Sequence, residues 1–362
     1  MKVGIMTFHR AINYGAVLQS LALKETIKSL GNECEIINYK CDELEKVASP
    51  FYVKSLHPKD IAVFLLQIKM RLLKNKRFDE FAKKYLDKSK PLLTPKNISK
   101  IASEYDAFVT GSDQVWNYEI TGLDENYFLN FAEKSKLRIS YAASFGVSSI
   151  PSQYREQYTQ LLGQMDCISV REEQGAAIVE SLIEKKSKVC VDPVFLFKKK
   201  QWRQYITMEK PKEEYIVVYC INKSECYEVA QELSEKTGLK VVGLQVPMSN
   251  RSKCMRIQTE SPEDFLGWLY YAKYVITDSF HGTAFSVIFN KQFLVCTGGS
   301  TKGRSSRQEN LLNMLGLSSR MSFTDKPLSI MDTIDYTKVN DILESAAAES
   351  KAFLQNLLRE KG

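Results

Sequence analysis

The chain has 362 residues, of which 44% are hydrophobic and 26% are charged, and its formal net charge is +7. This is the composition of a globular protein that is long enough for two domain cores. No uncharged apolar run approaches membrane-spanning length and no apolar leader follows Met1, so we expect a soluble cytoplasmic protein. The positive charge suits an anionic substrate or lipid headgroups, whereas nucleic acid is not expected as a partner because no recognised binding module accompanies the charge.

Strand-like and helix-like segments alternate from the first residues. A strand over 3–8, a helix over 15–30 and a strand over 34–39 form a βαβ opening, which predicts a parallel sheet with helices on both faces. Further strand-like segments lie at 107–111, 138–146, 167–171 and 187–197. We therefore predict a first Rossmann-like domain over residues 1–200.

The segment 59–86 interrupts this alternation. Apolar residues recur there at helical intervals among many Lys and Arg residues, which predicts a basic amphipathic helix with a break near Asn75. Two interpretations remain open. The helix lies on an anionic membrane surface, or it packs on its own domain, which is the commoner reason for such a pattern.

A polar stretch over 198–214, which contains Trp202, marks the predicted domain boundary. Beyond it, strand-like segments at 215–221, 239–244, 274–278 and 293–298 alternate with helical segments at 224–238 and 261–272. They predict a second Rossmann-like domain over 210–330, and 335–362 indicates a terminal helix that can pack back on the first domain. The predicted fold class is α/β, with two doubly wound domains that face each other across a cleft.

His281 follows a predicted strand directly and lies in the first turn of a predicted helix. Asp278 and Ser279 supply helix-capping chemistry, and apolar residues then recur at helical spacing. Backbone N–H groups converge in a first helical turn and can hold an anion there. Because the chain has only three histidines, His281 is a candidate acid or base. The alternative is a histidine that only orients the loop.

Ligands of open α/β sheets bind beyond the carboxyl ends of the strands, so other polar residues at those ends are candidates too. They are His9, Asn13, Tyr14, Gly15, Ser112, Asp113, Trp116, Ser144, Arg171, Arg304 and Arg307. Each has a structural alternative: Arg171 pairs with Glu172 or Glu173, His9 stabilises the first turn, and the cations of 298–307 form a solvated surface. The convergence of several loops at one sheet edge favours a site.

Several common chemistries lack their sequence signals. There is no GxGxxG, Walker loop, GxSxG or metal-ligand cluster, so we expect neither a cofactor nor a metal. The eight cysteines are scattered without a CxxC pair or neighbouring histidines, which predicts buried reduced thiols. A two-domain, metal-independent group transferase with an anion-binding cleft remains.

Six ordered motifs resemble those of the polysaccharide pyruvyl transferase family. They are TFHRAINYGAVLQSLAL, TGSDQVWN, YAASFG, SVREEQG, CVDPVFLF and TDSFHGTAFSVIFNKQF, and the resemblance spans about Gly4 to Arg320. It implies two Rossmann-like domains arranged as in GT-B glycosyltransferases, phosphoenolpyruvate as donor, and a sugar of a surface polysaccharide or its lipid-linked precursor as acceptor. An acceptor on a lipid implies peripheral contact with the inner membrane surface.

The resemblance also implies residue roles. SVREEQG matches the family's strand-end arginine motif at Arg171, and SFHG matches its Arg-Leu-His motif at His281, with Ser279 where many members have arginine. The donor side then comprises Arg171, Ser279, Arg304, Arg307 and Arg320. The acceptor or cleft side comprises His9, Asn13, Tyr14, Gly15, Ser112, Trp116 and Ser144, with Asp113 as acceptor contact or second base beside His281. Two alternatives are a glycosyltransferase-like enzyme that uses a nucleotide sugar and a non-catalytic member of the same fold.

Overall fold

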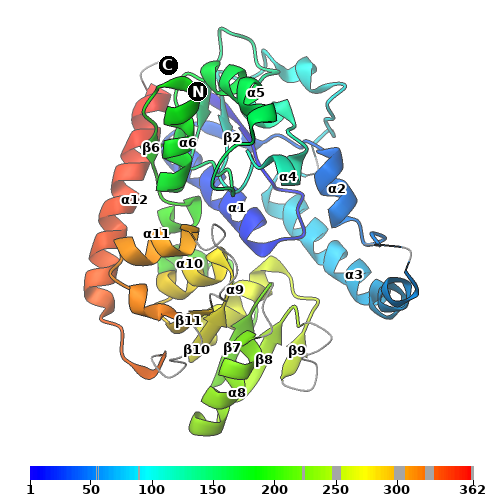
Figure 1. Cartoon of the computed structure of the whole chain (residues 1–362), viewed down its shortest axis with the longest axis vertical. Coiled ribbons are helices and arrows are strands. Elements are labelled where there is room, and N and C mark those ends of the chain that lie inside the picture. The colour runs from blue at the N-terminus through cyan, green and yellow to red at the C-terminus, as the bar shows by residue number, and fades with distance from the viewer. Residues whose placement is uncertain are drawn as a thin grey trace. The chain divides into compact units, whose positions relative to one another are not determined.

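The computed structural model describes residues 1–53, 55, 57–88, 90–221, 225–246, 254–296, 306–322 and 330–359. The chain forms two compact units (Figure 1). Unit 1 comprises Met1–Leu196 and Ser345–Gly362, and unit 2 comprises Phe197–Glu344. None of the helices within the described ranges is long and apolar enough to cross a membrane.

Unit 1 contains a parallel sheet in the order β2-β1-β3-β4. Its strands are β1 (Lys2–Met6), β2 (Glu33–Ile36), β3 (Ala107–Thr110) and β4 (Leu137–Ser140), and a short parallel pair follows, β5 (Ser169–Val170) with β6 (Lys188–Val189). In the register Met6 is level with Thr110, and Thr110 with Ser140, so three strands end together. The strand order reverses between β1 and β3, and such a reversal opens the binding crevice of an α/β sheet.

The helices of unit 1 join these strands and cover the sheet. They are α1 (Tyr14–Ser29), α2 (Asp42–Ala48), α3 (Pro58–Tyr85), α4 (Tyr118–Thr121), α5 (Ser152–Gly163) and α6 (Glu173–Ile183), with single 3₁₀ turns η1 (Ile98–Ile101), η2 (Glu125–Phe128) and η3 (Pro193–Leu196). The end of α12 (Tyr336–Arg359) also belongs to unit 1, where Ser350 Oγ accepts a hydrogen bond from Val191 N at 3.1 Å.

Helix α3 corrects one prediction. It is continuous through Asn75, whose side-chain amide donates to Arg71 O at 3.1 Å, so the predicted break is absent. Its last turns pack on unit 1, since Phe78 and Phe81 are almost fully buried. Its first turns expose several leucines. Packing on its own domain therefore explains only the second half of the amphipathic pattern.

Unit 2 contains a six-stranded parallel sheet in the order β12-β11-β10-β7-β8-β9. Its strands are β7 (Tyr215–Tyr219), β8 (Lys240–Leu244), β9 (Met255–Ile257), β10 (Tyr274–Thr277), β11 (Gln292–Cys296) and β12 (Met321–Ser322). From β7 the sheet is extended on one side by β8 and β9, and on the other side by β10, β11 and β12. This is the strand order of dinucleotide-binding Rossmann folds. Thr277 is level with Tyr219, so β10 and β7 end together at the reversal.

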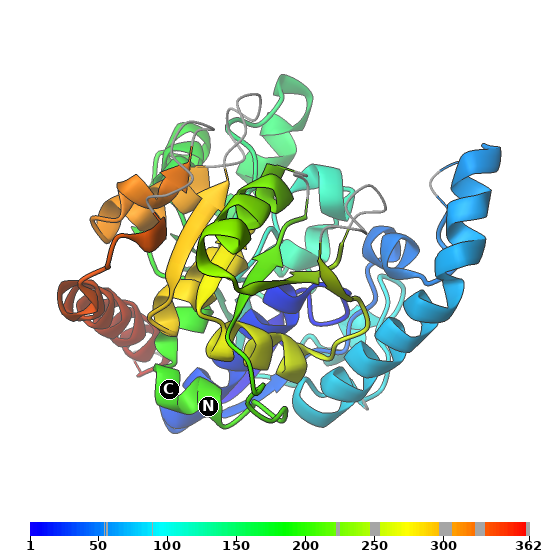
Figure 2. The same cartoon turned by 90° about the horizontal axis from the view of Figure 1, so that it is seen from below.

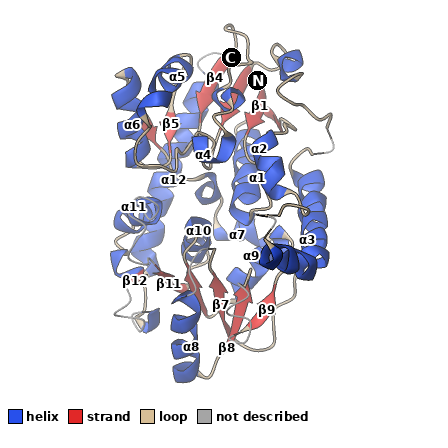
Figure 3. Cartoon of the chain, turned by 45° about the vertical axis from the view of Figure 1, so that its right-hand side comes forward, coloured by secondary structure: helices blue, strands red, loops and turns tan. Residues whose placement is uncertain are grey.

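Helices lie on both faces of this sheet, with α8 on one side and α9 and α10 on the other (Figure 3). The helices of unit 2 are α7 (Lys199–Arg203), α8 (Glu225–Thr237), α9 (Pro262–Tyr271), α10 (Phe280–Ile288), α11 (Ser306–Met314) and the start of α12, with the 3₁₀ turn η5 (Ser318–Arg320). Helix α9 begins at the start of the predicted segment 261–272, where Ser261 Oγ accepts from Asp264 N and Asp264 Oδ2 accepts from Ser261 N.

The prediction that all eight cysteines are reduced thiols is wrong for two of them. Cys220, at the end of β7, and Cys226, in the first turn of α8, form a disulfide. Because helix α8 packs back against the strand that precedes it, two residues six apart in sequence come together. The other six cysteines are not part of a disulfide in the part of the chain that the structure describes, and Cys167 and Cys254 are only partly buried.

Candidate active site

Three predicted residues of unit 1 lie side by side beyond the ends of β3, β4 and β5. Asp113 forms an isolated parallel bridge with Ala143, and Ala143 forms one with Val170. Ser144 N donates to Asp113 O at 2.9 Å, and Arg171 N donates to Ala143 O at 3.1 Å. The chain therefore extends the sheet in register beyond its regular strands, and this brings Asp113, Ser144 and Arg171 to one edge.

Arg171 is surrounded by carboxylates at this edge. Its Nη1 donates to Asp192 Oδ2 at 2.7 Å, Glu172 Oε2 lies 3.6 Å from Nε, and Asp113 Oδ1 lies 3.8 Å from Nη2. Burial disfavours the charged guanidinium, but the three carboxylates outweigh burial and raise the pKa of Arg171. The interpretation that Arg171 pairs with Glu172 is confirmed. Asp192 is its shortest contact and was missed from sequence.

Serine hydroxyls fix two of these carboxylates. Ser144 Oγ donates to Glu172 Oε1 at 2.6 Å, and Ser112 Oγ lies 3.1 Å from Asp192 Oδ2. Both serines are fully buried, so they position the carboxylates and do not offer a surface to a ligand. We call Asp113, Arg171, Glu172 and Asp192 the unit 1 charge cluster. Within it, Asp113 has the most exposed side chain, at 12%.

Gly111 explains why the chain can leave β3 in this direction. Its φ is +111°, and a Cβ atom on it would lie 2.4 Å from the carbonyl oxygen of Tyr141. A side chain is therefore excluded by both the backbone conformation and the neighbouring strand. The turn directs Ser112 inward, where its N–H donates to Gln19 Oε1 at 3.1 Å.

His9 is a buried structural residue in the loop after β1. Its Nδ1 lies 3.2 Å from Thr7 O, and its Nε2 lies 3.4 Å from Asn38 Oδ1. Burial lowers the pKa of His9 to about 4 against the two hydrogen bonds, and Arg10 and Lys88 lower it further. The ring is therefore neutral at physiological pH, in accord with the interpretation that His9 stabilises the first turn.

Three further predicted acceptor residues turn out to be packing residues. Trp116 is fully buried, stacks on Phe128 with ring centroids 5.4 Å apart, and so presents no surface to a ligand. Tyr14 and Gly15 are buried in the first turn of α1. Asn13 is exposed, and its Oδ1 caps α1 by accepting a hydrogen bond from Ala16 N at 3.2 Å. The periodicity of α1 explains why Tyr14 and Gly15 are buried, and aromatic packing explains why Trp116 is buried.

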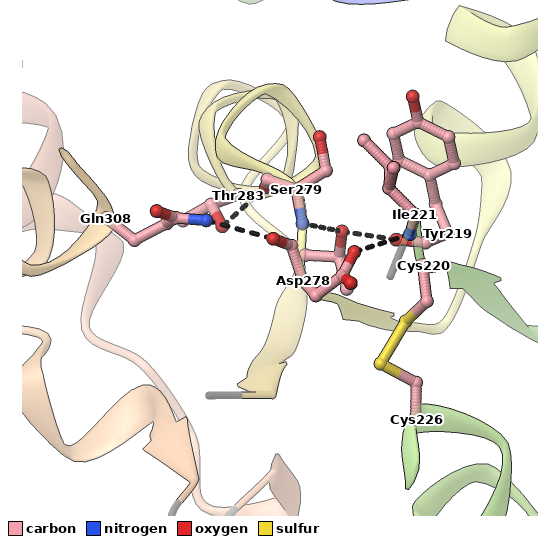
Figure 4. Close-up of a disulfide and its surroundings, with 9 residues drawn as sticks. Tyr219, Cys220, Ile221, Cys226, Asp278, Ser279, Thr283 and Gln308 are labelled. Carbon is pink, nitrogen blue, oxygen red and sulfur yellow. Dashed lines mark hydrogen bonds between the residues drawn. A yellow bond between two sulfur atoms is a disulfide. The ribbon is translucent and has the colours of Figure 1, made fainter. Parts of the chain in front are cut away.

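The ends of β7 and β10 in unit 2 are joined by a hydrogen-bond network (Figure 4). Asp278 Oδ1 accepts from Ile221 N at 2.6 Å, and Thr277 Oγ1 donates to Tyr219 O at 2.6 Å. Cys220, which forms the disulfide with Cys226, lies between Tyr219 and Ile221 in the same loop. The predicted capping role of Asp278 is therefore replaced by a bond between the two strand ends, which fixes the entrance to α10.

His281 is the second residue of α10, as predicted. Ser279 is the N-cap, and its Oγ accepts from Gly282 N at 3.4 Å. The His281 ring packs edge-on against Phe280 with centroids 5.2 Å apart, and the Arg307 guanidinium lies 5.9 Å from the centroid of the same Phe280 ring. The structure therefore brings Arg307, from α11, into the neighbourhood of His281.

The other predicted donor cations are less informative. Arg320 is buried in η5, and its guanidinium donates to the Asp332 carbonyl. Burial lowers the pKa of Arg320, partly offset by Tyr336 and Asp332. Arg304 lies outside the described residues.

A pocket of about 510 Å³ lies elsewhere, at the amino ends of β7, β10 and β11. One of its lysines has a structural role, because Lys291 Nζ donates to Ala272 O at 2.9 Å, just after the end of α9. Burial lowers the pKa of Lys291 to about 8, with help from Lys199 and Lys210. Among the predicted site residues that the structure describes, none lines this pocket. The pocket lies at the amino ends of the strands, opposite to the ends where such folds bind ligands.

Comparison with solved structures shows the class of fold to which the chain belongs. The chain is similar to a putative UDP-N-acetylglucosamine 2-epimerase from Listeria monocytogenes, at 10% identity and TM-score 0.53, over 99% of this chain and 96% of that one. It is also similar to the UDP-N-acetylglucosamine 2-epimerase from Rickettsia bellii, at 11% identity and TM-score 0.51, over 99% and 96%. At such identity the likeness shows the fold alone. It confirms the predicted class of two doubly wound Rossmann-like domains of the GT-B type.

A comparison with sequence families identifies the chain more specifically than its fold does. Residues 13–300 match the family model of polysaccharide pyruvyl transferase. The chain therefore belongs to the polysaccharide pyruvyl transferase family, as its ordered motifs predicted. No curated protein sequence matches the chain.

Proposed function

We propose that the protein transfers a pyruvyl group from phosphoenolpyruvate to a sugar of a surface polysaccharide, or of its lipid-linked precursor, and closes a ketal ring in the cytoplasm. Family membership supports the transferase. The observation that carries the proposal is the placement of His281 in the first turn of α10, at the strand-order reversal of unit 2, with Arg307 on the neighbouring Phe280 ring.

The reaction forms two new C–O bonds at one carbon of the donor, the first by addition and the second by displacement of phosphate. The methylene carbon of phosphoenolpyruvate gains a proton and becomes a methyl group, while one sugar hydroxyl bonds to the adjacent carbon and loses its proton. A second hydroxyl then bonds to that carbon and loses its proton, and the bond to the phosphate oxygen breaks. Phosphate leaves with one of the released protons. The step needs a proton donor, a proton acceptor and stabilisation of the leaving phosphate.

The residues of unit 2 supply the donor chemistry. As an imidazolium, His281 can protonate the methylene carbon, and as a neutral ring it can accept a hydroxyl proton. The first turn of α10 and the Arg307 guanidinium favour a dianionic phosphate beside it. Ser279 occupies the position of the family arginine, but here its side chain is committed to capping α10.

The unit 1 charge cluster suits a hydroxyl-bearing ligand. Asp113 is held near Arg171 yet keeps the most exposed side chain, so its carboxylate can accept a hydrogen bond or a proton from a sugar hydroxyl. A donor role for Arg171 would require its guanidinium to share a phosphate with the three carboxylates that already surround it. We therefore assign Arg171 the positioning of Asp113.

The proposal is tested by transfer from phosphoenolpyruvate to a panel of lipid-linked and free polysaccharide fragments. Phosphate release and the mass of the ketal product are measured together. His281→Asn should lower kcat by about 10²–10⁴-fold at an unchanged melting temperature. His57→Asn, at an exposed histidine outside the site, is the matched control. Full transfer by a folded His281→Asn variant would remove the catalytic assignment.

The donor is tested separately by ligand-observed NMR. Phosphoenolpyruvate should bind the wild-type protein and bind the Arg307→Gln variant more weakly, because a guanidinium forms charge-assisted hydrogen bonds to phosphate that an amide cannot. UDP-sugars serve as the comparison. Binding and turnover of a UDP-sugar without any binding of phosphoenolpyruvate would overturn the donor assignment and leave a nucleotide-sugar enzyme in its place.

A further inference from the structure

Helix α3 exposes a band of large apolar side chains along its first four turns. The exposed fractions are 38% for Ile61, 64% for Leu65, 66% for Leu66, 44% for Leu72 and 42% for Leu73. At about 100° per residue these five positions fall within roughly 140° of one another around the helix axis. We call them the exposed face of α3. Figures 1 and 2 show the first turns of α3 reaching outward from the rest of unit 1.

The rest of the helix holds this face in a fixed orientation. Phe78 and Phe81 anchor the last turns in unit 1, and Phe78 packs on Tyr14 with ring centroids 5.0 Å apart. Near the middle of the helix, Arg71 Nη1 donates to Tyr52 O at 2.7 Å, which ties the preceding segment to α3. Exposure of the leucines is thus a consequence of how the other side of α3 is packed.

The charge pattern of the same stretch is one-sided. Between Ile61 and Phe78 the sequence contains five cations, which are Lys69, Arg71, Lys74, Lys76 and Arg77, and no Asp or Glu. Lys69 and Lys76 are exposed and fall within the angular range of the apolar band, and Lys76 Nζ lies 3.9 Å from Glu80 Oε1 at the end of the stretch. A surface that is both apolar and positively charged complements a surface that offers acyl chains and negative charge together.

We infer that the exposed face of α3 binds the surface of an anionic lipid bilayer, with its leucines in the headgroup and acyl boundary and its lysines at the phosphates. Interfacial helices combine an apolar face with cations in this way, and each cation near an anionic leaflet adds to the attraction. A protein partner would require carboxylates placed opposite lysines that lie among leucines. The bilayer needs no such match. The inference goes beyond the proposed reaction and does not depend on it.

The test is co-sedimentation of the full-length protein with vesicles, without donor or acceptor. Vesicles of phosphatidylglycerol and phosphatidylethanolamine are compared with vesicles of phosphatidylcholine alone. The wild-type protein should bind the anionic vesicles, and high salt should weaken this binding. The double variant Leu65→Ser/Leu72→Ser should bind at least about tenfold more weakly, because both side chains are apolar contacts of an interfacial helix. A second variant, Lys69→Glu/Lys76→Glu, should show the same loss.

The controls use matched exposed positions. Leu92→Ser removes a leucine of unit 1 with the same 44% exposure as Leu72, and Lys134→Glu reverses an exposed lysine outside α3. Both should bind like the wild-type protein. Absence of wild-type binding to anionic vesicles would overturn the inference, as would equal binding by the α3 variants and their controls. A wild-type dimer in solution that the leucine variant dissociates would instead assign the face to a second copy of the chain.

Discussion

The buried His9 makes a prediction about how stability depends on pH. Folding lowers the pKa of His9 from 6.5 to about 4, mainly through burial. Between these two values the unfolded chain binds a proton that the folded chain does not, so this contribution to stability is complete above pH 6.5 and is lost as the pH falls toward 4. A fall from about pH 7.5 to about pH 5 should remove about 2 kcal/mol through His9 alone.

The measurement is a pair of urea titrations, at about pH 7.5 and about pH 5, on the wild-type protein and on His9→Gln. The difference in unfolding free energy between the two pH values should be about 2 kcal/mol smaller in His9→Gln, which cannot take up the proton. His57→Gln, at an exposed site, is the control. Because the chain has three histidines, a ¹H NMR titration also resolves His9 directly. Parallel pH dependence of wild type and His9→Gln, or a His9 signal that titrates near pH 6.5, would refute the reasoning.

Four further variants and one labelling experiment probe other parts of the structure. Arg171→Met should destabilise unit 1 by about 3–5 kcal/mol in a thermal unfolding experiment, because it leaves buried carboxylates without their cation; a loss under about 1 kcal/mol would mean that the unit 1 charge cluster is hydrated. Ser279→Ala should cost about 0.5–1 kcal/mol in urea unfolding, and Ser261→Ala more, because Ser261 forms the shorter cap bond within a reciprocal pair; the opposite order would contradict the cap geometry. Alkylation of the denatured, unreduced protein should label six of its eight cysteines, and eight labelled thiols would exclude the disulfide between Cys220 and Cys226. Cys220→Ser should lower the free energy of unfolding by about 2 kcal/mol, because it removes this disulfide.

Strand positions could be predicted from the sequence because parallel strands buried on both faces are continuous apolar runs. Tyr215–Tyr219 and Ala107–Thr110 are fully buried strands, and both had been predicted within two residues. The same logic located the polar residues after the strands, since Asp113 and Arg171 meet at one edge. The short strands Met255–Ile257 and Met321–Ser322 were missed because edge strands of two or three residues leave no periodic signal.

Side-chain roles were harder to predict than positions, because they depend on neighbours that are distant in sequence. Trp116 follows a strand end just as Asp113 does, yet its indole N–H donates to Tyr127 O at 3.1 Å and its ring lies in the core. Asp192 lies in a quoted motif, but nothing local distinguishes it from a turn residue. Its role appears only when the sheet brings it within 2.7 Å of Arg171. Local patterns predict which edge a residue reaches, and tertiary packing decides which way its side chain turns.

At position 279 the chain has serine where many members of the family have arginine. An arginine at the N-cap of α10 would supply a guanidinium but would not accept a hydrogen bond from Gly282 N as Ser279 does. In this chain Ser279 makes the cap, and the Arg307 guanidinium from α11 lies 5.9 Å from the centroid of Phe280, the ring against which His281 packs. Under the proposed function, capping is therefore provided by α10 and the cation for anion binding by α11. Under the proposed function the Arg307 guanidinium takes the place of the family arginine, so the serine at position 279 does not by itself argue for a non-catalytic member.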